Sequence, residues 1–161
     1  MATAAEHISQ AKRNFKFLEM VSNSISPNSD WQVTIGFYTA VHIINAHLAT
    51  FNLHYQTHES VKNAISPFGN IESLRVPEGI YKAYVKLQSL SRRARYLVND
   101  STSENSEASF IHAIHLARAL RHLDTIMQYF CGKYPAQFDK IHIKCCELTQ
   151  NENLRHYILL H

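Results

Sequence analysis

The chain of 161 residues contains little glycine, proline or cysteine, and it contains no long apolar run. Four glycines and four prolines argue against a turn-rich β-sandwich. The cysteines, Cys131, Cys145 and Cys146, form neither a CxxC pair nor zinc-ligand spacing, and a sparse, odd set is typical of a reducing compartment. No run of 18 apolar residues or signal-peptide core occurs. We therefore expect a cytoplasmic protein without a membrane partner.

Histidine is unusually frequent for its type, with 11 copies beside 16 Lys and Arg and 13 Asp and Glu. The net charge of +3 permits contact with nucleic acid without demanding it. The histidines add positive charge as the pH falls toward about 6. Hydrophobic residues make up 45% of the chain, and its length is enough for one domain with a substantial core.

Apolar periodicity predicts helices over about 3–24, 31–51, 58–66, 77–98 and 107–131. The expected caps and first-turn residues are Asp30 for the second helix, Thr57 for the third and Pro77 for the fourth. The polar run 99–107 is expected to be a loop. These patterns predict an all-α fold, an antiparallel up-and-down helical bundle of four to five main helices.

The predicted bundle covers residues 1–135, and residues 136–161 form a short C-terminal extension that is harder to interpret. Residues 141–145 alternate like a strand, although a helix is equally compatible, and residues 151–161 fit a last helical segment. We find no internal repeat and no second domain.

Two polar residues occupy core-facing positions of predicted helices, where unpaired polar groups are costly. His42 belongs to an apolar stripe of the second helix, and Arg95 lies near the apolar edge of the fourth. Two interpretations stay open. Either His42 is a hydrogen-bonded core histidine and Arg95 forms an internal salt bridge to Glu59, Asp30 or Glu6, or the two line a functional cleft in which Arg95 binds phosphate.

Two further stripes of basic residues are candidates for nucleic-acid contact. Lys82, Lys86 and Arg93 share a polar face of the fourth helix, and Arg118 and His122 share a sector of the fifth. Such stripes are either solvated faces or contacts to phosphate, and dimerisation would align two copies into one groove.

Three motifs together are similar to a known family. They are Asp30-Trp31-x-Val33-Thr34-x-x-Phe37-Tyr38-x-Ala40-x-His42, His54-x-x-x-His58-Glu59 and Ser91-x-x-Ala94-Arg95-Tyr96. Over roughly residues 30–98 the chain resembles the bacterial HEPN group (higher eukaryotes and prokaryotes nucleotide-binding), and more narrowly a poorly characterised branch of it. The resemblance implies an up-and-down helical bundle, frequent dimerisation and an association with RNA or nucleotides.

Many HEPN proteins are metal-independent ribonucleases of toxin or defence systems, so the resemblance also implies a cognate antitoxin-like partner. Their signature is an Arg followed by a His after four to six residues, and Arg155 and His161 match it. In such a pair the His moves a proton and the Arg stabilises charge on the phosphate. His42, His58 and Arg95 are the alternative catalytic candidates, and no metal or cofactor is expected.

Two other functions stay open at this point. A non-catalytic dimeric interaction module would explain the apolar helices without any chemistry. A metal-binding bundle would use His54 and His58 with His42 or His47, although the chain lacks the Glu-x-x-His pattern of di-iron bundles. The sequence therefore predicts nucleotide or RNA binding and leaves open whether the protein cleaves its ligand.

Overall fold

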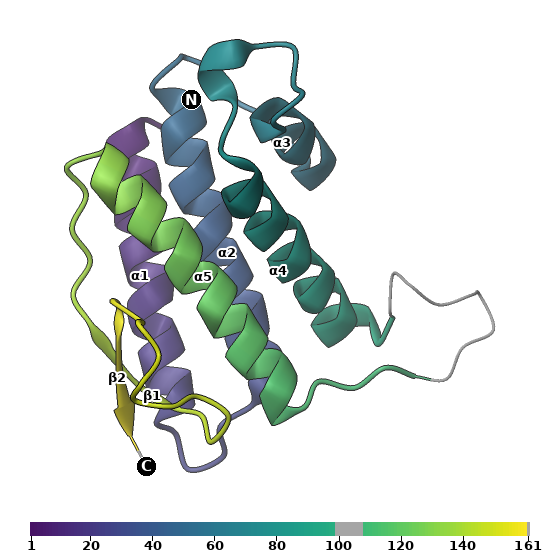
Figure 1. The fold of residues 1–161 in the computed structure, drawn as a ribbon, viewed down its shortest axis with the longest axis vertical. Helices are drawn as coiled ribbons and strands as arrows, with labels where there is room; N and C mark the ends of the chain where they lie inside the picture. Colours follow the sequence, from purple (N-terminus) through teal and green to yellow (C-terminus); the bar gives the residue numbers. More distant parts are fainter. Residues whose placement is uncertain (99–107, 161) are drawn as a thin grey trace.

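Four long helices run antiparallel, side by side, in the computed structural model, which describes residues 1–98 and 108–160 (Figure 1). The elements are α1 (Ala4–Ser22), α2 (Ser29–Ala49), α3 (His58–Ile65), the short 3₁₀ helix η1 (Glu72–Leu74), α4 (Glu78–Tyr96), α5 (Ala113–Lys133), β1 (Ile141–Lys144) and β2 (Tyr157–Leu160). The predicted all-α bundle is confirmed. The expected loop over 99–107 and the candidate His161 lie outside the described residues.

Helix α2 is the centre of the bundle because it is apolar nearly all round. It packs against α1, α4 and α5, and Val33, Phe37, Ile44 and Leu48 are completely buried. A helix with apolar residues on several faces has to lie in such a central position. None of the helices in the described part of the chain combines the length and apolarity needed to cross a bilayer.

The helix starts follow the side chains that cap them. Thr3 and Glu6 form a capping box at α1, and Thr57 caps α3 as predicted by accepting from the Ser60 N–H at 3.1 Å. The predicted cap of α2 is wrong. Because α2 begins at Ser29, Asp30 lies within its first turn, and Asn28 accepts from the Trp31 N–H at 2.9 Å instead.

Helix α5 begins six residues later than the periodicity predicted and ends at Lys133 rather than at 131. The preceding residues are tied to the end of α4. The Ser109 N–H donates to the Leu97 carbonyl at 2.8 Å, and Arg93 Nε donates to the Phe110 carbonyl at 2.8 Å. Because the backbone of residues 109 and 110 is bonded to the end of α4, it is not available for the hydrogen bonds of a helix, and α5 starts only after it.

The tail folds back on the bundle as a parallel pair of strands, β1 and β2, with Ile141 opposite Tyr157 (Figure 1). The strand alternative at 141–144 is confirmed, whereas the expected terminal helix over 151–161 is wrong. Ile141, Ile143 and Tyr157 are buried against the bundle. The alternating burial along β1 is the reason why a strand forms here, since period-two burial matches a strand with one covered face.

Candidate functional site

Side chains from α2, α3 and α4 meet around Arg95, and we call Tyr38, His58, Arg95 and Tyr96 the Arg95 site. The guanidinium carbon of Arg95 lies 5.9 Å from the Tyr38 ring centroid and 5.1 Å from that of Tyr96. The Tyr38 and His58 ring centroids are 5.9 Å apart. The structure therefore brings together two of the predicted candidates, His58 and Arg95, with two tyrosines that the sequence did not single out for this role.

Arg95 is half-buried and contacts aromatic rings rather than carboxylates. Its Nε donates to the Ser91 carbonyl at 3.2 Å. Among the described residues, no ion pair joins it to the expected partners Glu59, Asp30 or Glu6. Arginine stacked on rings keeps most of its N–H donors available, because a ring contact engages the face of the guanidinium and not its edge.

Arg95 also lines a cavity of about 320 Å³ that is bordered by the first turn of α2 and the last turn of α4. Its lining includes Asp30, Trp31 and Thr34 with Arg95. Trp31 is 62% exposed, so its ring is accessible from solvent. The Asp30 Oδ1 is buried with no hydrogen-bond partner in the described structure. A carboxylate oxygen of this kind is able to accept a hydrogen bond from a donor that enters the cavity.

His58 is expected to be neutral near pH 7. Burial lowers its pKa, and the positive charge of Arg95 lowers it further. A neutral imidazole can accept a proton, which is the property required of a general base. The same charge that would attract a phosphate therefore keeps His58 in the form able to receive a proton.

His42 does not join the Arg95 site. Its Nδ1 lies 3.1 Å from the Nδ1 of His7 on α1, whereas Tyr38 contacts α3 and α4. Burial lowers the pKa of His42, and the neighbouring His7 and Arg13 lower it further. His42 is thus a hydrogen-bonded histidine in the α1–α2 interface, which agrees with the first of the two interpretations for His42 and not with a cleft that it lines together with Arg95.

The two predicted basic stripes form one surface because α4 and α5 pack against each other. Burial lowers the pKa of His122, and Lys86 and Arg118 from the two helices lower it further. We call Lys86, Arg118 and His122 the basic face. Lys82 pairs with Glu78 at 2.5 Å, and Arg93 is engaged at the end of α4 by the Phe110 carbonyl.

Arg155, the first residue of the signature pair, does not lie on a helix. Arg155 is exposed, and its backbone N–H donates to Asp124 at 3.2 Å, while its candidate partner His161 is not described. Strand β2 occupies most of the sequence between them. A strand separates successive residues by about 3.3 Å each, so the described residues that follow Arg155 are extended and do not form a helical turn.

Three of the four histidines proposed as metal ligands, His42, His47 and His58, have different surroundings, and in the described part of the chain His54 joins no metal-binding group with them. His58 contacts Tyr38, His42 contacts His7, and His47 bonds to the Tyr134 hydroxyl at 2.5 Å and the Leu74 carbonyl at 3.2 Å. Within residues 1–98 and 108–160 no three His, Cys, Asp or Glu side chains converge as a metal site would require.

One buried ionic cluster was not predicted. Asp124, 1% exposed, accepts a hydrogen bond from His156 Nδ1 at 2.8 Å and another from the His156 backbone N–H at 3.0 Å. The available signal was an aspartate at an apolar position of the fifth helix. Its partner lies 32 residues away in a tail whose fold the sequence left open.

Comparison of the chain with protein-family models, curated proteins and solved structures finds no match.

Proposed function

We propose that this protein binds RNA or a nucleotide at the Arg95 site, with a phosphate on the guanidinium. The observation that carries the proposal is the half-buried Arg95, which is held by two tyrosine rings at the edge of a cavity and has no carboxylate partner among the described residues. Arginine with unoccupied donors is well suited to bidentate phosphate binding.

Two residues of the cavity, Trp31 and Asp30, and the neighbouring Tyr96 match the remaining parts of a nucleotide. Trp31 and Tyr96 are exposed aromatic side chains, at 62% and 63%, on which a base can stack. The unsatisfied Asp30 oxygen can accept a hydrogen bond from a ribose hydroxyl or an amino group of a base. The protein thus offers a partner for the phosphate, for the base and for a hydrogen-bond donor of the ligand, which favours a nucleotide over free phosphate.

The basic face supports RNA as the ligand. Lys86 and Arg118 provide positive charge on the α4–α5 surface, and Arg95 lies in the last turn of α4. Lys86 and Arg95 are nine residues apart on α4, so an RNA strand that contacted both would have to cross from one side of that helix to the other. RNA binding should then depend on salt, because each neutralised phosphate releases counterions.

The fluorescence of Trp31 tests the proposal directly, since this is the chain's only tryptophan. Titration with adenosine monophosphate or a short single-stranded RNA should quench it. Arg95→Gln should weaken binding by about tenfold or more, as expected for loss of a charge-assisted contact. Arg75→Gln is the matched control, because Arg75 is exposed and bonds to the Gly69 carbonyl.

Equal binding by wild type and Arg95→Gln would refute the site. Binding of RNA but not of the mononucleotide would mean that the basic face is required. The double variant Lys86→Ala, Arg118→Ala should then reduce the slope of affinity against salt by about two.

Metal-independent cleavage is the catalytic form of this proposal. His58 would take the proton of the 2′-hydroxyl, and Arg95 would stabilise the charge that develops on the phosphate. An RNA pool in EDTA compares wild type with His58→Ala and Arg155→Ala. Loss only in His58→Ala assigns cleavage to the Arg95 site, loss only in Arg155→Ala assigns it to the signature pair, and no cleavage leaves a binding protein.

A dimeric interaction module is the second candidate function. It is favoured by Phe17 and Met20, two large apolar side chains exposed on α1 three residues apart. Light scattering should then report a dimer that Phe17→Glu, Met20→Glu dissociates. A monomeric wild type would exclude this candidate.

A further inference from the structure

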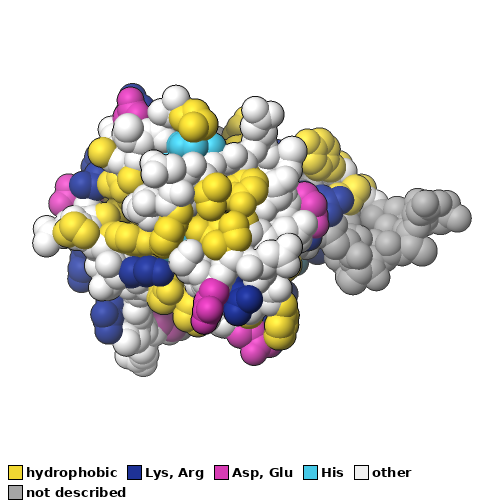
Figure 2. Space-filling model, turned by 90° about the horizontal axis from the view of Figure 1, so that it is seen from above, with side chains coloured by type: hydrophobic (Ala, Val, Ile, Leu, Met, Phe, Trp, Pro, Cys, Tyr) yellow, Lys and Arg dark blue, Asp and Glu magenta, His cyan; other side chains and the backbone are white. Residues whose placement is uncertain are grey.

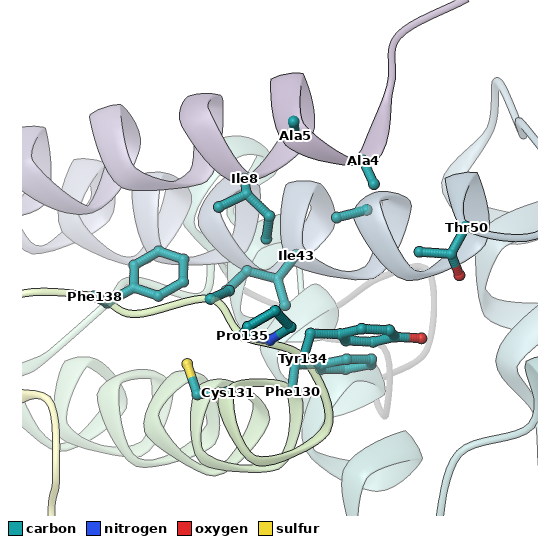
Figure 3. Close-up of a pocket in the computed structure, with 12 residues that line it drawn as sticks. Ala4, Ala5, Ile8, Ile43, Thr50, Phe130, Cys131, Tyr134, Pro135 and Phe138 are labelled. Atoms are coloured by element: carbon teal, nitrogen blue, oxygen red, sulfur yellow. The ribbon is translucent and has the colours of Figure 1, made fainter.

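Two cavities lie next to each other along α1, and they differ in their charge. The first, of about 320 Å³, lies between the start of α1 and the ends of α2 and α5 (Figure 3). The second, of about 470 Å³, lies farther along α1, between this helix and residues 137–141. Phe138 lines both cavities, so its side chain stands at the boundary between them. A single ligand that lies along α1 can therefore reach both.

The first cavity is apolar. Figure 3 shows that Ile8 of α1 and Phe138 point into it. Its lining contains no charged side chain, and apolar side chains also gather on the surface at this end of the bundle (Figure 2). The hydroxyls of Tyr134 and Thr50 are already bonded to His47, at 2.5 Å and 2.7 Å. A cavity of this size and lining accepts an alkyl chain and not a phosphate.

The second cavity is cationic. Its lining contains Lys12, Arg13 and Lys16 and one carboxylate, that of Asp139. Lys16 is paired with Glu19, whereas Lys12 and Arg13 have no carboxylate partner in the described parts of the chain. With the Lys16–Glu19 pair and Asp139 taken into account, one net positive charge remains. This charge matches a singly charged carboxylate better than a phosphate, which carries up to two negative charges.

Lys12 is the residue that links the two cavities. Its Nζ lies 5.8 Å from the ring centroid of Phe138. Ala5, Ile8 and Lys12 follow one another at steps of three and four residues, so they share one face of α1. Ala5 and Ile8 line the apolar cavity, and Lys12 lines the cationic one. Ala5 and Lys12 are about 10 Å apart along the helix axis, which is the reach of an extended chain of about eight carbons with bonds of about 1.5 Å.

We propose that the two cavities together bind a single-chain amphipathic anion, the carboxylate of a medium-chain fatty acid. Its alkyl chain lies in the apolar cavity against Ile8 and Phe138. Its carboxylate lies beside Lys12, which thereby gains the ion-pair partner that it lacks, and Arg13 adds positive charge. This site is separate from the Arg95 site, because no described residue lines both.

Isothermal titration calorimetry of the full chain with octanoate and 1-octanol tests the position of the carboxylate. Octanoate should bind once per chain and about tenfold more tightly than octanol, because only octanoate forms the charge-assisted contact. Lys12→Gln should remove this difference. Lys140→Gln is the matched control, since Lys140 is also exposed but does not line the cavity. Equal binding of the two ligands by wild type, or unchanged octanoate binding by Lys12→Gln, would overturn the proposal.

A series from hexanoate to decanoate tests the position of the alkyl chain. Affinity should rise about fourfold for each added methylene, as burial of apolar surface requires. Ala5→Phe fills the end of the apolar cavity far from Lys12, so it should abolish the rise beyond hexanoate and leave hexanoate binding intact. Ser9→Phe is the control, since Ser9 is exposed on α1 and lines neither cavity. An affinity independent of chain length, or the same loss in Ser9→Phe, would contradict the assignment.

An acyl chain beside an anionic group also occurs in a membrane lipid, and sedimentation with phosphatidylglycerol vesicles separates the two sources. We expect the protein to stay in the supernatant while it binds octanoate. Sedimentation with the vesicles together with no octanoate binding would replace the free fatty acid by a lipid surface and overturn the proposal. Ala5 and Lys12 are both exposed, so their variants should fold, which circular dichroism checks.

Discussion

His58 and His156 occupy opposite electrostatic surroundings in one small protein. Burial lowers the pKa of both rings. For His58 the neighbouring Arg95 lowers it further, whereas for His156 burial is the largest single influence but the raising effects, of which the hydrogen bond to Asp124 is the largest, together outweigh it and raise the pKa to about 9. The comparison shows that the sign of the nearest charge, and not burial alone, decides whether a histidine is charged.

The two regions also differ in how their charges are satisfied. Asp124 accepts from two backbone N–H groups and from the side chains of His156 and Gln128, so its region is closed. Arg95 has ring contacts and one carbonyl, and the oxygen of Asp30 nearby is unsatisfied. The region around Asp124 contributes to stability. The region around Arg95 still has hydrogen-bonding groups that a ligand can satisfy.

Removal of the Asp124 carboxylate should have the largest effect. Asp124→Ala leaves a buried imidazolium and two backbone N–H groups without their acceptor, which costs about 3–5 kcal/mol. The free energy of unfolding from urea titration measures this loss. Asp139→Ala is the exposed control and should change it by less than about 0.5 kcal/mol. A small loss of stability in Asp124→Ala would mean that the Asp124–His156 pair does not form in solution.

The second largest effect should come from raising the pH, which removes the contribution of His156 to the free energy of unfolding. A histidine whose pKa rises from 6.5 unfolded to about 9 folded contributes stability that is complete below pH 6.5 and lost as the pH passes about 9. The shift corresponds to about 3 kcal/mol. Urea unfolding at pH 6.5 and 9.5 should show this loss in wild type but not in His156→Gln. Parallel changes in both proteins would contradict the assignment.

Removal of the Arg95 guanidinium should cost far less stability. Arg95→Met keeps most of the apolar stem and loses two ring contacts, each worth about 0.5–1 kcal/mol at a partly exposed site. We expect an unfolding free energy within about 1.5 kcal/mol of wild type, together with loss of nucleotide binding. A loss as large as that of Asp124→Ala would show that Arg95 is structural and not held for a ligand.

The smallest expected effect is on the titration of His58. Without the positive charge of Arg95, the pKa of His58 in Arg95→Gln should rise toward 6.5 but stay below it, because burial still lowers it. Nuclear magnetic resonance of the imidazole protons measures this change. The pKa of His42 provides the control, since burial, His7 and Arg13 lower it. An unchanged His58 would mean that Arg95 does not act on it.

Much of the bundle could be predicted from local sequence because helix periodicity is a local property. Thr57 capped its helix as expected, and the four long helices were found. The start of α5 was missed because its first residues are held by bonds to Leu97 and Arg93, two contacts from another helix. The strand β2 was missed because strand pairing depends on a partner 16 residues away along the chain.

The Arg95 site was predictable only in part. The position of Arg95 near the apolar edge of its helix predicted that it is partly buried, and His58 was predicted as a catalytic candidate. Which group would face the arginine depends on the rotation of α2 and α4 against each other. That rotation places Tyr38 over Arg95 and turns His42 toward α1.

The tail has a consequence for the dynamics of the protein. It leaves the end of α5 and returns to the middle of the same helix, where Arg121 pairs with Glu152 at 2.5 Å and Asp124 with His156. Such a segment can open as one unit while the bundle stays folded. Amide hydrogens of β1 and β2 should therefore exchange together, and sooner than those of α2. Each opening would break the Asp124–His156 and Arg121–Glu152 pairs, so hydrogen exchange of the tail would report how often the buried aspartate loses its partner.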